Sequence, residues 1–294
     1  MSFFTKTRII GILLLVIAVL GVLAKKPGAA WLGVLGIILL IAPSKHTQHM
    51  LDLFTTSFTG WKTIIITALY DAVYYSLLRL AWEFVKWQLQ VKAAAAESQS
   101  TLTQTALANP ELVAQNIIAA QSMLGFMLAA GIGILIFSFI TYTISRGLIW
   151  TTIAQQKFNK TFLLKFAGLN ALWWLVWAPF FILVSLAGKT SPYVKDSYLA
   201  ILFIAMYFTP IVHILYMKKH LIGYSIGNGL GWGISKIHRL IIPYSFGLVI
   251  WIIAYQLFRL FATTIYIEAA WWLFVVLFIA WLRTYLYHAI QTFK

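Results

Sequence analysis

The chain has 294 residues and a net charge of +15; 62% of its residues are hydrophobic, 10% are charged and none is cysteine. Soluble domains have about 45–50% apolar and roughly 25% charged residues, so this composition excludes an ordinary soluble protein and predicts one embedded in a membrane. The lack of cysteine excludes disulfides, thiol catalysis and thiolate metal sites, while the positive charge fits either nucleic-acid binding or the cytoplasmic face of a membrane protein.

A helix needs about 20 apolar residues to cross the hydrocarbon core of a bilayer. Apolar runs lie at residues 7–24, 29–43, 62–85, 116–145, 162–187, 198–217, 240–262 and 268–290. The first two are short, and the sequence KKPG at 25–28 predicts a tight turn and hence a helical hairpin. The basic start and the apolar run ending at Ala24 also fit a cleaved signal peptide, which would leave the remaining topology unchanged.

Basic residues are distributed unequally between alternate loops. With the N-terminus inside, the cytoplasmic segments hold 14 of the 22 Lys and Arg residues and one acid, Asp52. The opposite side holds six basic residues and five acids. Lys and Arg collect on the cytoplasmic side, so this pattern predicts a multi-pass protein of the cell membrane with both termini in the cytoplasm. It also disfavours nucleic acid as a partner, because no single basic domain exists.

Residues 91–112 form the only long polar stretch, which predicts a mobile helix or a loop outside the membrane. Within it, Asn109, Pro110 and Glu111 are typical of a helix start, with a proline in the first turn and an acid near the positive end of the helix dipole. We expect no chemistry in this segment.

Segments 44–61, 146–161 and 218–239 mix basic, aromatic and apolar residues on the cytoplasmic side. Such a mixture is typical of amphipathic helices that lie in the membrane interface. Each segment precedes a pair of spans, so the chain is expected to form a single membrane domain, 1–294. Its expected parts are an N-terminal hairpin, 1–43, and three units, 44–145, 146–217 and 218–294. The predicted fold is an all-α polytopic bundle with about eight transmembrane helices.

The third apolar run contains the strongest candidate site. Asp71, Tyr75, Arg79 and Glu83 recur every four residues, a spacing that keeps side chains near one helix face. Ionisable groups inside a span are costly unless they are paired or hydrated, so this stripe predicts either a functional site or a structural network. In the first case Asp71 accepts a proton or cation and Arg79 contacts an anion. In the second, Arg79 pairs with Glu83 or both lie at headgroup level. Asp71, about two turns from Arg79, needs another partner in either case, a water or a proton.

Glycines and basic residues in 218–239 also admit two interpretations. The glycines form two sets with four-residue spacing, Gly223, Gly227 and Gly231, and Gly229 and Gly233. The basic residues are Lys218, Lys219, Lys236 and Arg239. A flexible loop of this composition would hold a phosphate or an anionic lipid headgroup. A helix would use its glycine face to approach another helix closely, which we favour because no strand precedes the run.

Other polar residues are weaker candidates. His213 follows Pro210 in the sixth run and is expected to be a packed, neutral histidine rather than a titrating group. His46, His49 and Asp52 are three residues apart, but no fourth ligand is evident, so no metal and no cofactor are predicted. The motifs of zinc proteases, phosphate-binding loops and nucleophile elbows are missing from the sequence, and no enzymatic activity is predicted.

Four short motifs give the chain a resemblance to other proteins. They are ALYDAVYY at 68–75, SRGLIW at 145–150, KF at 165–166 and NALWW at 170–174. Together they resemble segments of uncharacterised archaeal multi-pass membrane proteins, over about residues 60–185. The resemblance implies an archaeal source and a multi-pass fold, and no known activity accompanies it.

Two classes of function follow from these patterns. The first, slightly favoured, is transport of a small solute or ion along the stripe in the third run. The second is a non-catalytic scaffold or assembly subunit that binds another membrane protein or a second copy of itself. The bilayer and anionic headgroups at the cytoplasmic face are expected partners in either case. A water-accessible cavity reaching Asp71 would favour transport, and a dry stripe buried between helices would favour a structural role.

Overall fold

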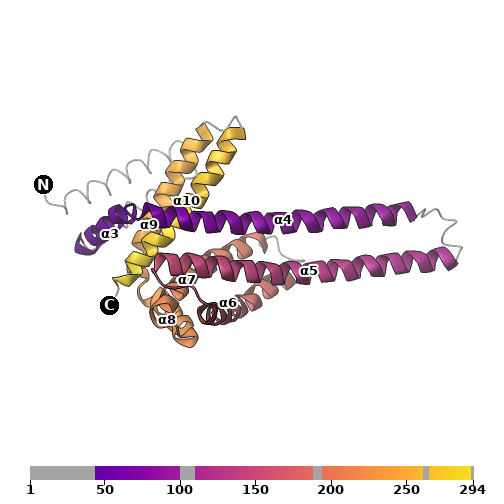
Figure 1. The fold of residues 1–294 in the computed structure, drawn as a ribbon, viewed down its shortest axis with the longest axis horizontal. Helices are drawn as coiled ribbons and strands as arrows, with labels where there is room; N and C mark the ends of the chain where they lie inside the picture. The colour runs from indigo at the N-terminus through magenta and orange to yellow at the C-terminus, as the bar shows by residue number, and fades with distance from the viewer. Residues whose placement is uncertain (1–43, 100–109, 188–193, 261–264, 293–294) are drawn as a thin grey trace. The chain divides into compact units, whose positions relative to one another are not determined.

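The computed structural model describes residues 44–99, 110–187, 194–260 and 265–292, and the regular structure in these ranges is α-helical (Figure 1). The helices are α3 (Ser44–Ser57), α4 (Trp61–Gln99), α5 (Pro110–Ile153), α6 (Lys160–Ala187), α7 (Val194–Lys219), α8 (Ile222–Ser235), α9 (Ile237–Leu260) and α10 (Ile265–Gln291). The predicted all-α class is confirmed.

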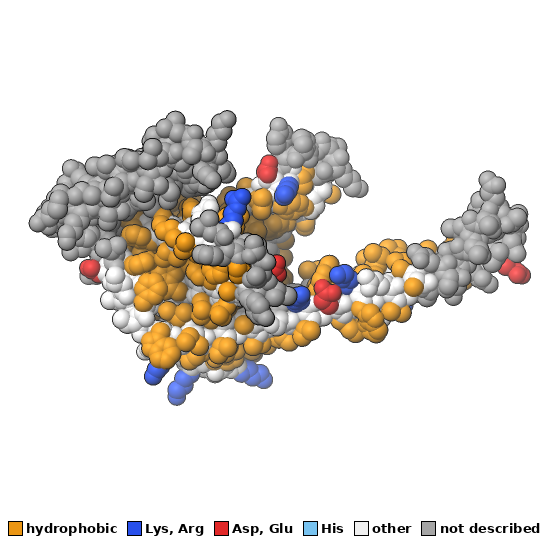
Figure 2. Space-filling model, turned by 90° about the horizontal axis from the view of Figure 1, so that it is seen from above, with side chains coloured by type: hydrophobic (Ala, Val, Ile, Leu, Met, Phe, Trp, Pro, Cys, Tyr) orange, Lys and Arg blue, Asp and Glu red, His pale blue; other side chains and the backbone are white. Residues whose placement is uncertain are grey.

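Six of these helices are long and apolar enough to cross a membrane. The candidate spans are Trp61–Ala94, Ile117–Ile153, Lys160–Leu186, Val194–Lys219, Ile237–Arg259 and Ile267–Gln291. They correspond to the six apolar runs predicted from residue 62 onward, and hydrophobic side chains dominate the described surface in Figure 2. The chain is therefore a multi-pass membrane protein. The runs 7–24 and 29–43, and with them the total of about eight spans, lie outside the described residues.

The chain divides into two compact units. The two-helix unit is Leu69–Leu148 and contains most of α4 and α5; the other unit comprises the residues up to Ala68 and those from Ile149 onward. The expected repeat of three units stays a prediction.

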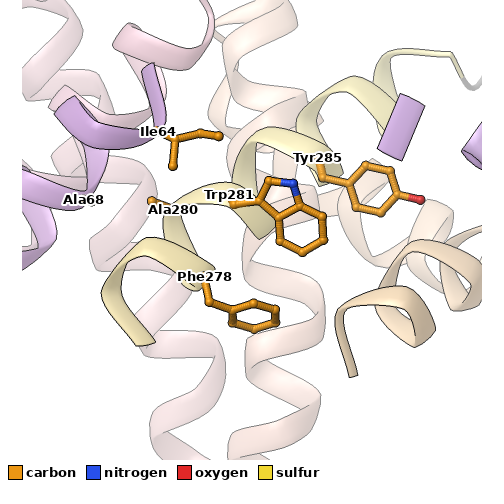
Figure 3. Close-up of a cluster of buried hydrophobic side chains, with 6 residues drawn as sticks. All are labelled: Ile64, Ala68, Phe278, Ala280, Trp281 and Tyr285. Carbon is orange, nitrogen blue, oxygen red and sulfur yellow. The ribbon is translucent and has the colours of Figure 1, made fainter. Parts of the chain in front are cut away.

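An aromatic core in the larger unit joins α3 to α10. Trp281 and Tyr285 of α10 lie in a buried cluster with Ile64 and Ala68, which precede the two-helix unit (Figure 3). The Trp281 indole N–H donates to the Ser57 hydroxyl at 2.8 Å, and the Tyr285 hydroxyl donates to the Met50 carbonyl at 3.1 Å. The first segment predicted as an amphipathic helix is thus a helix, and its buried side packs on α10.

The second predicted interfacial segment, 146–161, is not a separate helix, and that prediction is wrong. α5 continues to Ile153, because Ile149, Trp150 and Ile153 keep burying apolar surface at helical spacing. The helix ends before Gln155, which has a positive φ of 54°. α6 begins at Lys160, where the Asn159 side chain accepts the backbone N–H of residue 162 at 2.8 Å and caps the new helix.

The polar stretch 91–112 is partly helical. Residues 91–99 continue α4, and α5 begins at Pro110 with Glu111 in its first turn, which confirms the predicted helix start. Residues 100–109 lie outside the described part of the chain.

The glycines of α8 let it pack closely against α7. A Cβ atom at Gly229 would lie 2.5 Å from a methyl carbon of Val212, and one at Gly233 would overlap the ring of Phe208. The Tyr207 hydroxyl donates to the Gly233 carbonyl at 2.7 Å. The helix-packing interpretation is therefore confirmed for these two glycines. Gly223, Gly227 and Gly231 have open space around them.

Alanine substitutions on the two faces of α8 are expected to have opposite effects. Gly229→Ala forces a methyl group into Val212 and should lower the free energy of unfolding by about 1–3 kcal/mol. Gly231→Ala adds helix propensity on an open face and should raise it by roughly 0.5–1 kcal/mol. Unfolding by SDS in mixed micelles measures both, and equal effects of the two variants would contradict close packing at Gly229.

Candidate functional site

Asp71 of α4 forms a buried ion pair with Arg146 of α5. The Arg146 Nη1 atom lies 2.5 Å from the Asp71 Oδ1 atom and donates a hydrogen bond to it. Asp71 is 0% exposed and Arg146 is 7% exposed. Both residues belong to the two-helix unit, so the pair joins the two long helices to each other.

Two tyrosine rings complete the surroundings of Arg146. Its guanidinium carbon lies 5.3 Å from the ring centroid of Tyr74 on α4 and 5.3 Å from that of Tyr142 on α5. The faces of aromatic rings attract cations, so the two rings offset part of the hydration that Arg146 loses. Next to it, the Ser145 hydroxyl donates to the carbonyl of residue 70 at 3.3 Å. We call Asp71, Arg146, Tyr74 and Tyr142 the clamp.

The rest of the predicted stripe lies apart from Asp71. Tyr75 is 45% exposed, and Arg79 and Glu83 are exposed as well. Glu83 pairs with Lys86 at 3.6 Å, and no ion pair between Arg79 and Glu83 is present among the described residues. Helical geometry explains the separation: each four-residue step advances about 40° beyond a full turn, which puts Glu83 about 120° around the helix from Asp71.

The exposed members of the stripe lie beside the most apolar part of α5. Two contacts join α4 to α5: Asp71 contacts Arg146, and the Lys92 ammonium lies 5.1 Å from the Phe126 ring centroid. The contacts are 21 residues apart on α4 and 20 residues apart on α5, so the two helices lie side by side between them. Residues 126–145 contain no charge. The α4 polar face, which we define as Tyr75, Arg79, Glu83 and Lys86, therefore runs alongside an uncharged helix segment.

A second buried polar cluster lies in the larger unit. The indole N–H of Trp150 donates to His213 Nδ1 at 2.9 Å, and His213 Nε2 lies 2.9 Å from Asn170 Oδ1. All three side chains are at most 1% exposed. An indole nitrogen only donates, so Nδ1 accepts and the ring is neutral with its proton on Nε2, which donates to Asn170. This geometry agrees with the expected packed, neutral histidine.

The basic residues near α8 differ in exposure and in their contacts. Lys218 is half-buried; its ammonium donates to the Ile290 carbonyl at 3.4 Å and lies 5.7 Å from the Trp232 ring centroid. Lys219 is exposed, and Lys236 and Arg239 are partly exposed. Contact of these residues with headgroups stays a prediction.

The metal interpretation of the His46, His49 and Asp52 set is not tested, because the His46 side chain lies outside the described residues. Within the described part of the chain, no group of three His, Cys, Asp or Glu side chains is placed to hold a metal ion.

The sequence patterns did not indicate the partner residues of either cluster. Arg146 belongs to segment 146–161, which the sequence predicts to be an interfacial helix on the cytoplasmic side rather than part of a span that faces Asp71. Asp71, Arg146, Trp150 and Asn170 all lie in the motifs that resemble archaeal membrane proteins. These motifs therefore coincide with buried polar contacts in this chain.

Comparison of the chain with protein-family models, with curated proteins and with solved structures finds no match.

Proposed function

We propose that this chain is a non-catalytic membrane scaffold or assembly subunit that binds another membrane-spanning chain through the α4 polar face. The observation behind the proposal is that this face is exposed beside an uncharged segment of α5. Asp71, the one member of the predicted stripe that is buried, is already held by Arg146.

The energetics of the bilayer support this role. An unpaired arginine at the centre of a span costs about 2.5–3.5 kcal/mol even on the most lenient scale, and less near the surface. Helices in membranes associate through close packing and polar contacts between their side chains. A partner helix with a carboxylate or carbonyl group facing Arg79 would remove that cost, whereas lipid chains would not.

Photocrosslinking in native membranes tests the proposal. A benzophenone amino acid at Tyr75 should form one adduct of defined mass, while the same probe at Tyr255, a similarly exposed tyrosine of α9, should form none. Arg79→Leu should lower the adduct yield at least about tenfold, because a hydrogen bond to a charged group contributes about 1.5–3 kcal/mol. Arg259→Leu, at another exposed arginine, is the matched control.

The outcomes separate the possible partners. An adduct of twice the chain's mass identifies a second copy as the partner, and any other fixed mass identifies a different protein. Equal labelling at Tyr75 and Tyr255, or an Arg79→Leu yield equal to that of the control, would overturn the proposal.

Transport of a small solute or ion is the second candidate, supported by the presence of an ionisable pair inside two candidate spans. It requires that purified protein in liposomes moves a solute or protons and that Asp71→Asn stops the flux. Wild-type protein that moves nothing across a solute panel, yet forms the Tyr75 adduct, would leave only the scaffold.

We also propose that both termini lie in the cytoplasm and that Lys219, Lys236 and Arg239 meet anionic headgroups there. The support is the excess of Lys and Arg in alternate loops. An archaeal source remains the implication of the four motifs.

A further inference from the structure

An apolar groove lies between α4 and α5 in the two-helix unit. It has a volume of about 240 Å³, and all the side chains that line it are apolar. Small residues, Ala81, Ala130 and Gly133, leave the space open, and Phe84, Phe126 and Phe137 form its walls. A Cβ atom at Gly133 would meet nothing within 4 Å, so the space at this position is free of other protein atoms.

The dimensions of the groove match a lipid chain. Phe126 and Phe137 are 11 residues apart, which is about 17 Å along a helix. One leaflet contributes about half of the hydrocarbon core of roughly 30 Å, or about 15 Å. Both walls belong to candidate membrane spans. A groove of this length inside the membrane fits a single extended acyl chain lying along α5.

A positive charge stands at one end of the groove. The Lys92 ammonium lies 5.1 Å from the ring centroid of Phe126, at the end nearer to Gln99 of α4 and Pro110 of α5. Glu83 and Lys86, which lie beside the α4 wall of the groove, pair with each other at 3.6 Å and largely cancel. Lysine side chains in a span extend toward the headgroup region, so Lys92 is placed to meet a phosphate there.

We propose that this groove binds one anionic phospholipid, with an acyl chain between the phenylalanine walls and the phosphate on Lys92. Apolar attraction alone does not select this site, because bulk lipid is equally apolar. Selection comes from close packing in the groove together with the lysine charge, and one basic residue near a membrane surface changes binding of an anionic lipid about fivefold.

Native mass spectrometry of the whole chain, released from vesicles of phosphatidylglycerol and phosphatidylcholine in equal amounts, tests the proposal. The wild type should retain one phosphatidylglycerol molecule. Gly133→Leu fills the groove and should reduce retention at least about tenfold, since the loss of about ten close atom contacts suffices. Gly131→Leu is the matched control: it lies on the same helix, has equally open space and does not line the groove.

The charge is tested separately. Lys92→Gln should lower the preference for phosphatidylglycerol about fivefold while the groove still retains lipid. Equal retention by the Gly133→Leu and Gly131→Leu variants would overturn the site, and an unchanged preference in Lys92→Gln would overturn the phosphate contact. A wild type that carries no lipid but forms a dimer lost in Gly133→Leu would assign the groove to a second copy instead. None of these outcomes depends on the scaffold role, because Arg79 does not line the groove.

Discussion

Arg146→Met is expected to lower the free energy of unfolding by about 3–5 kcal/mol, the usual cost of leaving one member of a buried ion pair without its partner. The Asp71 carboxylate would keep its 0% exposure and lose the guanidinium that balances its charge. The methionine would also lose the attraction to the rings of Tyr74 and Tyr142. Titration of purified protein with SDS in mixed micelles, followed by circular dichroism, measures the change.

Removal of both charges separates a structural pair from other effects of the substitution. The double variant Asp71→Leu/Arg146→Met should recover most of the loss, because well-packed apolar residues replace buried ion pairs at little cost or with a gain. Lys157→Met, at an exposed position, should change the free energy of unfolding by less than about 0.5 kcal/mol. A single variant as stable as the wild type, or a double variant less stable than the single, would contradict the clamp.

His213→Leu is expected to cost about 2–4 kcal/mol. The substitution removes the acceptor of the Trp150 indole N–H and the donor to Asn170 Oδ1, both fully buried. Each buried polar group that loses its partner costs about 1–3 kcal/mol. The measurement is again SDS unfolding, and the change should appear in the larger unit without altering the Tyr75 crosslink, which belongs to α4.

His238→Leu is the matched control for this prediction, because His238 lies exposed on α9. It should leave the free energy of unfolding within about 0.5 kcal/mol of the wild type. If His213→Leu and His238→Leu behave alike, the Trp150–His213–Asn170 cluster does not contribute to stability as described.

The spans could be predicted from the sequence because the length of an apolar run alone decides whether a helix can cross a bilayer. The start of α5 at Pro110 could also be predicted from the sequence, because a proline and an acid at a helix start act within one turn. The continuation of α5 to Ile153 was not predictable in this way. It depends on burial of Ile149 and Trp150 by other helices, and a local mixture of basic and aromatic residues does not reveal such packing.

In the candidate site, too, local sequence patterns do not reveal contacts between distant helices. The position of Asp71 inside an apolar run indicated that it needs a partner, and the sequence pointed to a water or a proton. The structure instead pairs it with Arg146, which is 75 positions away on another helix. The four-residue spacing also predicted that Asp71, Arg79 and Glu83 share one helix face. Each four-residue step rotates the side chain by about 40°, so after three steps Glu83 lies about 120° around the helix from Asp71. His213 and Asn170 each looked ordinary alone, and only tertiary structure pairs them.

The helices α4 and α5 are much longer than the hydrocarbon core of a bilayer is thick. With 39 and 44 residues, they measure about 58 and 66 Å, roughly twice the hydrocarbon thickness of about 30 Å. No tilt within the usual range of about 0–40° brings helices of this length entirely into the hydrocarbon core. A stretch of each helix must therefore extend beyond the hydrocarbon core, into the headgroup region or the water.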